Sequence, residues 1–142
     1  MADKKRWVYS PSNYSKPKVP DDEKKMLTQQ FERLIEEELK PRYVNPESPR
    51  GWTVIEDIFG KWYRNFFHFY RVYQFSEDMR QSTGEMPPRG PIEDRFTRIE
   101  YLERDKFNVA YFRHTNQWWT VNRGISLQQV LEEITKNEIF HP

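Results

Sequence analysis

The chain has 142 residues, a length that fits one domain, and it contains no cysteine, which excludes disulfides, Cys-ligated zinc and thiol catalysis. Its 23 basic and 22 acidic residues leave a net charge of +1, so no general attraction to nucleic acid or anionic lipid is expected. No stretch of the sequence approaches the ~18 apolar residues of a membrane span.

Residues 1–20 are predicted to form an extended basic arm, because prolines and polar residues at this density disfavour both helix and sheet. No apolar run follows its first basic residues, so no signal peptide is expected and a cytoplasmic location is the default. The side chains expected to contact a protein partner are Lys4, Lys5, Arg6, Trp7 and Tyr9. Two placements stay open: the arm packs on its own domain, or it becomes ordered on that partner.

A helix is predicted over residues 21–40. Acidic residues fill its first turn, where the helix dipole favours them. One apolar stripe is drawn by Leu27, Phe31, Leu34, Ile35 and Leu39. Pro41 is expected to end the helix, because the residue before a proline avoids the α region.

The middle of the chain reads as β-structure. A first strand is predicted over residues 52–58, with a turn at Phe59 and Gly60 and a long second strand over 62–75. Both faces of the second strand are apolar, so we expect a central strand that is covered on both sides, at least in part. A polar loop follows over residues 76–94, a length at which loops are usually functional or disordered.

Three shorter strands are predicted over residues 95–103, 106–113 and 117–122, with Asp105 and Asn116 in the turns. A closing helix begins at Ser126, which forms a capping box with Gln129. Residues 21–142 are therefore predicted to be a single α+β domain. Its core is an antiparallel, aromatic-rich meander of four to five strands, with an amphipathic helix at the N-terminal and the C-terminal end.

Candidate ligand-binding residues gather at the turn before the last strand. Arg113, His114 and Trp118 combine a cation, an imidazole and a ring that together suit an anion or a stacked base. The simpler interpretation is a hairpin turn flanked by core tryptophans. No metal spacing and no catalytic residues are recognisable in the sequence, and no cofactor is expected.

Aromatic and basic residues also alternate along residues 62–71, which is the composition of a stacking surface for nucleic acid. The strand lacks the small residues that the RNA-recognition signature places between its aromatics. Rings that fill a core are therefore the favoured interpretation.

Five short segments of the sequence stand out: residues 5–11 (KRWVYSP), 16–20 (KPKVP), 61–64 (KWYR), 96–101 (FTRIEY) and 113–118 (RHTNQW). Together they resemble a group of small uncharacterised bacterial proteins, and the part from Phe96 onward resembles a bacterial domain-of-unknown-function family. The resemblance implies a bacterial, cytoplasmic protein. It carries over no activity, cofactor or catalytic residue.

The sequence thus favours a non-enzymatic binding or interaction module. Two alternatives are a small nucleic-acid-associated protein that uses the basic arm and the basic strands, and a small-ligand or hydrolytic site around His114.

Overall fold

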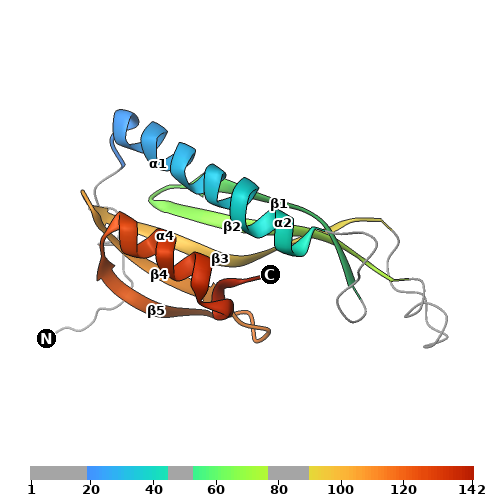
Figure 1. The fold of residues 1–142 in the computed structure, drawn as a ribbon. Coiled ribbons are helices and arrows are strands. Elements are labelled where there is room, and N and C mark those ends of the chain that lie inside the picture. Colours follow the sequence, from blue (N-terminus) through green and yellow to red (C-terminus); the bar gives the residue numbers. More distant parts are fainter. Residues whose placement is uncertain (1–18, 45–52, 77–89) are drawn as a thin grey trace, which may run out of the picture.

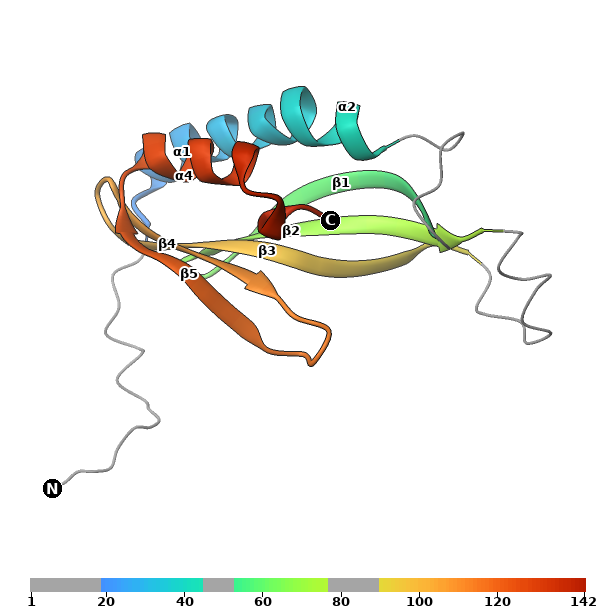
Figure 2. The same cartoon turned by 60° about the horizontal axis from the view of Figure 1, so that its bottom comes forward.

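The computed structural model describes residues 19–44, 53–76 and 90–142, which form an α+β fold. Five antiparallel strands lie side by side in chain order, β1-β2-β3-β4-β5, and helical segments precede and follow them. The helices lie together on one side of the sheet (Figures 1 and 2). The predicted meander with its two terminal helices is confirmed. Residues 1–18 of the predicted arm and residues 77–89 of the predicted loop lie outside the described residues.

The N-terminal helical layer is longer than predicted. Helix α1 (Asp21–Leu34) continues through a π-helical turn (Ile35–Leu39) into α2 (Lys40–Tyr43), so the prediction that Pro41 ends the helix is wrong. In the π turn the N–H of Lys40 donates to the carbonyl of Ile35, five residues back. Pro41 then falls in the first turn of α2, where a missing N–H is tolerated.

Strands β1 (Thr53–Tyr63) and β2 (Phe66–Phe75) form the first hairpin. The chain reverses at Arg64 and Asn65, not at Phe59 and Gly60, which lie inside β1. Arg64 adopts a positive φ of 55°, and buried Asn65 exchanges two hydrogen bonds with the backbone of Tyr101, at 2.8 and 3.2 Å. The turn is therefore fixed to β3 (Ile92–Glu103).

Gly60 serves a close approach and not a turn. A Cβ atom built on Gly60 would lie 2.2 Å from Cζ of Phe67, whose ring is fully buried. A glycine inside a strand often marks such a contact, and the prediction of a turn at Phe59 and Gly60 is therefore wrong.

The remaining strands lie close to their predicted positions. They are β4 (Lys106–Phe112) and β5 (Trp118–Ile125), and Asp105 and Asn116 adopt positive φ in the turns that precede them. Helix α4 (Leu127–Lys136) begins with the predicted capping box: Ser126 Oγ accepts from the N–H of Gln129, whose side chain accepts from the N–H of Ser126. A 3-10 turn (Glu138–Phe140) then brings Phe140 into the core.

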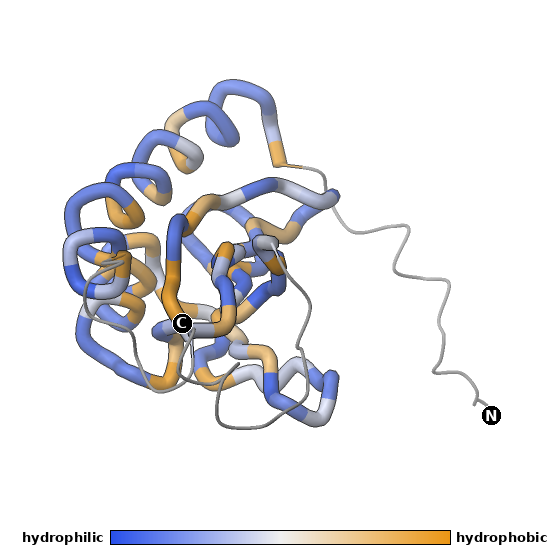
Figure 3. The backbone as a smooth tube through the Cα atoms, turned by 90° about the vertical axis from the view of Figure 1, so that its right-hand side faces the viewer, coloured by the Kyte–Doolittle hydropathy of each residue, from blue (hydrophilic) through white to orange (hydrophobic). Residues whose placement is uncertain are grey.

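The core lies between the helices and the sheet face that they cover. Its largest fully buried side chains are Phe31, Phe67, Phe69, Phe107, Phe140, Leu27, Ile35, Leu39, Ile58, Ile99, Ile134 and Val109. Hydrophobic positions recur among hydrophilic ones along the helices and strands (Figure 3). In the described part of the chain the helices cover one face of β2, and on its other face His68 is buried and Phe66 and Tyr70 are half-buried among side chains of the sheet. The expectation of at least partial cover on both sides of β2 is therefore met.

We predict that Gly60→Ala lowers the free energy of unfolding by about 1–3 kcal/mol, because the added methyl group overlaps a ring that the core holds in place. Urea unfolding measures the loss. In a Phe67→Leu background the same substitution should cost less. An equal cost in both backgrounds would contradict the role of the Phe67 ring.

Candidate functional site

We call the sheet face opposite the helices the open face. Strand alternation and the observed register place aromatic and basic side chains on it: Phe59, Lys61, Tyr63, Phe66, His68, Tyr70, Arg95, Arg98, Phe112 and Trp118. All five strands contribute to this set. The face thus combines rings and cations from segments far apart in the sequence.

Arg98 lies at the centre of the open face between two rings. Its guanidinium carbon is 4.4 Å from the ring centre of Phe66 and 4.5 Å from that of Trp118. A planar, weakly hydrated guanidinium is well suited to such stacking. Burial lowers the pKa of Arg98, whereas the charge of Glu100 raises it and that of Arg95 lowers it further.

Arg95 adds a second cation to the same cluster. Its guanidinium carbon lies 5.5 Å from the ring centre of Phe112 and 5.7 Å from that of Trp118. Trp118 therefore contacts both arginines. Ala110 pairs with Arg98 and with Thr120, and its small, 4% exposed side chain leaves room for Trp118 to reach across β4.

The two arginines lack ion-pair partners among the residues that the structure describes. By contrast, Arg71 on the covered face donates to both carboxylate oxygens of Asp94, at 2.6 and 3.2 Å. Glu93 and Glu100 lie toward opposite ends of the open face, since they pair with Val72 and Phe66. The centre of the open face is therefore positively charged.

His68 lies beneath these groups and is only 3% exposed. Its ring centre is 5.5 Å from that of Trp118, and its Nδ1 atom has no hydrogen-bond partner in the described part of the chain. Burial, followed by the positive charges of Arg95 and Arg98, lowers the pKa of His68 to about 4. The imidazole is therefore neutral at pH 7.

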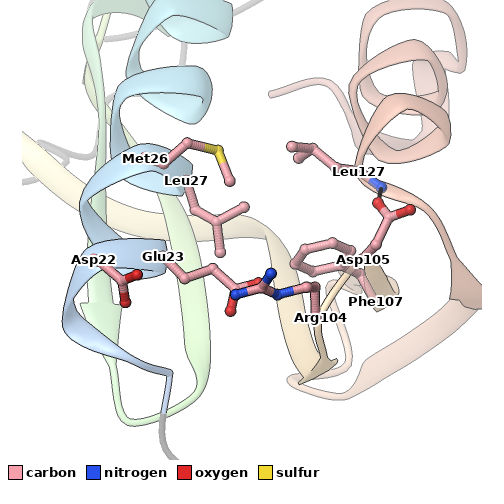
Figure 4. A pocket seen from close by; sticks show the side chains of 8 residues that line it. All are labelled: Asp22, Glu23, Met26, Leu27, Arg104, Asp105, Phe107 and Leu127. Atoms are coloured by element: carbon pink, nitrogen blue, oxygen red, sulfur yellow. Dashed lines mark hydrogen bonds between the residues drawn. The ribbon is translucent and has the colours of Figure 1, made fainter.

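A separate cleft of about 290 Å³ opens on the helix side, between the start of α1, the β3–β4 turn and the start of α4 (Figure 4). It is lined by Asp22, Glu23, Met26, Leu27, Arg104, Asp105, Phe107 and Leu127. Glu23 accepts a 2.8 Å hydrogen bond from the hydroxyl of Tyr101, whose pKa is raised to about 12 mainly by burial and then by this bond. Asp105 accepts from the N–H of Leu127 at 2.8 Å. These two carboxylates are engaged in holding the helices on the sheet.

The structure distributes the predicted ligand-binding residues over different surroundings. Arg113 lies 4.8 Å over the ring of Trp119, which alternates with Trp118 and faces the other side of β5. His114 is exposed in the β4–β5 turn, and Trp118 joins Arg98 and His68 instead. A ligand site formed by Arg113, His114 and Trp118 stays a prediction. The arm residues Lys4, Lys5, Arg6, Trp7 and Tyr9 lie outside the described residues.

The other titratable groups of the described residues include no set of three or more His, Asp or Glu side chains that could hold a metal ion.

His141 has a structural role that the sequence did not indicate. Its Nε2 donates to the carbonyl of Ile134 at 2.7 Å, and the hydroxyl of Tyr43 lies 2.5 Å from its Nδ1. These contacts tie the C-terminus to the end of the N-terminal helical layer.

Residues 19–142 match the family described as a domain of unknown function, DUF3024. The chain belongs to the DUF3024 family. This match confirms the resemblance to an uncharacterised family that the sequence motifs indicated. No curated protein and no solved structure matches the chain. Within the described residues of this DUF3024 protein, no helix is long and apolar enough to cross a membrane.

The buried imidazole predicts a pH dependence of stability. The unfolded state binds a proton near pH 6.5 and the folded state near pH 4, so the free energy of unfolding falls as the pH drops between these values. The loss amounts to at most about 3 kcal/mol. Urea unfolding at pH 7 and pH 4.5 should show a smaller decrease for His68→Phe than for the wild type.

Exposed His114 provides the control, because His114→Gln should keep the pH dependence of the wild type. An unchanged pH dependence in His68→Phe would contradict the burial of a neutral imidazole at this position.

Proposed function

We propose that this DUF3024 protein is a non-enzymatic binding module and that the open face of its sheet is its binding surface. The observation that carries the proposal is Arg98, held 4.4 and 4.5 Å from two rings on a face that no described helix covers. Arginine and the large aromatic residues dominate the energetics of binding surfaces. The same residue types gather here from five strands.

The charge on the open face supports an anionic partner. Arg98 is half-buried and has no ion-pair partner among the described residues, which costs free energy that its two rings compensate only in part, and Arg95 adds a second, exposed cation beside it. A partner that supplies negative groups to Arg95 and Arg98 would gain from this unpaired charge while it covers the rings. Binding is thus favoured by electrostatic attraction and by apolar contact at the same place.

The chemistry of the open face suits binding better than catalysis. General acid–base catalysis is most effective when the pKa lies near the working pH. The imidazole on this face has its pKa lowered to about 4 and is covered by Trp118 and its neighbours. The residues around it stack and carry charge, and neither role requires bond making.

Site-directed crosslinking tests the proposal, and the absence of natural cysteines makes one introduced thiol unique. Thr120→Cys places a photoreactive label on the open face of β5, and Gln29→Cys places the same label on the exposed side of α1. In extract from the native source, position 120 should form an adduct with a macromolecule and position 29 should not. Arg98→Ala should abolish that adduct.

Nuclease and protease digestion would then assign the adduct to nucleic acid or to protein. Equal labelling from both positions, or labelling at position 120 that persists in Arg98→Ala, would contradict the open face as the binding surface.

A further inference from the structure

We infer that the partner of the open face is single-stranded nucleic acid, an inference that rests on the proposed function. Proteins bind single strands by combining aromatic platforms, on which successive bases stack, with cations that follow the phosphates. The open face presents both in one continuous row.

The stacking groups lie at the two sides of the sheet. Phe59 and Tyr70, from β1 and β2, have ring centres 4.9 Å apart and planes only 2° from parallel. Phe112 and Trp118, from β4 and β5, have ring centres 4.9 Å apart. Five strands at the usual ~4.8 Å spacing give this row a length of about 19 Å, enough for several stacked bases.

Two cations lie between the two ring pairs, because Arg95 and Arg98 occupy the central strand β3. A third cation lies beside the first pair: Nζ of Lys61, on β1, is 5.5 Å from the ring centre of Tyr70. A strand that crosses the sheet from β1 to β5 would thus meet rings, then guanidinium groups, then rings again. The phosphates between two stacked bases would lie where the positive charge is concentrated.

Single-stranded nucleic acid uses more of this surface than the other anionic partners. An acidic protein segment would satisfy Arg95 and Arg98 but carries no ring that would extend the stack formed by Phe59 and Tyr70. Duplex nucleic acid presents phosphates, but its bases are already stacked on one another. Only unpaired bases can use both ring pairs and the cations together.

The experiment is fluorescence anisotropy of the full chain with labelled oligouridine and oligothymidine of about 12 nucleotides, within the ~4–16 that comparable sheet surfaces cover. We expect both to bind, and a duplex of equal length to bind more weakly. With two to three phosphates neutralised, log K should fall with log salt at a slope of about −1.4 to −2.

Adjacent tryptophans provide a matched pair of variants. Trp118→Ala should weaken binding about 5–150-fold through a lost stacking partner. Trp119→Ala removes a more exposed ring, at 47%, from the other face of β5 and should leave binding unchanged. Arg98→Ala should reduce the salt slope by about 0.7, whereas Arg33→Ala on α1 should not. If Arg98→Ala fails to fold, Arg98→Lys replaces it in the experiment, because lysine keeps the charge but loses the planar group that stacks on the rings. This variant should weaken binding and keep the salt slope.

The inference is overturned if neither oligonucleotide binds, if the duplex binds as tightly, or if Trp119→Ala weakens binding as much as Trp118→Ala. If the oligonucleotides fail while position 120 still crosslinks to a protein in an Arg98-dependent way, the proposed function stands and this inference falls. If both experiments fail, the open face is not a binding surface.

Discussion

A guanidinium held between two rings organises the exposed half of this protein. Arg98 reaches Phe66 on one side and Trp118 on the other, although the three residues come from β3, β2 and β5. The contact exists because the register pairs Arg98 with His68 and with Ala110, and because Ala110 is small enough for Trp118 to extend over it. If the register changed by one residue, the side chain of Arg98 would lie on the covered face and its contacts with Phe66 and Trp118 would be lost.

The covered face makes the open face possible. The helices bury Phe67, Phe69 and Ile99 on one side of the sheet, and buried hydrogen bonds fix the layers to each other. Thr97 donates to the carbonyl of Phe140 at 2.8 Å, and Tyr101 donates to Glu23 at the same distance. The core is complete on that side, so the rings and cations of the opposite side are not needed to hold the described helices, and we propose that a partner contacts them.

Local signals predicted much of this fold. The stripe from Leu27 to Leu39, the Ser126–Gln129 capping box and the strand-rich middle each depend on neighbours a few residues apart, and the structure contains all of them. One failure arose where a residue served a contact with another strand: Gly60 reads as a turn but makes way for the ring of Phe67. The other has a local cause, because a π turn precedes Pro41 and lets the helical layer continue past a residue that reads as a helix end.

The open face could not be predicted from the sequence, because it depends on contacts between strands that are far apart in the chain. A single strand over residues 62–75 gives no way to tell that Phe67 enters the core while Phe66 does not. That distinction comes from the turn at Arg64 and Asn65. The stacking composition was visible in the sequence, but the partners that complete it, Arg95, Arg98 and Trp118, lie about 25 to 50 residues further along the chain. Only sheet pairing brings them together.

The tryptophan indole signals in a ¹H–¹⁵N NMR spectrum test the central claim most directly. Trp118 reports on the open face, Trp119 on the other side of β5, and Trp62 on the helix layer, where its Nε1 donates to Thr28 at 2.7 Å. Adding unlabelled single-stranded oligonucleotide should shift the signal of Trp118 and leave those of Trp119 and Trp62 in place. Shifts confined to Trp119 or Trp62 would contradict the open face as the site of binding.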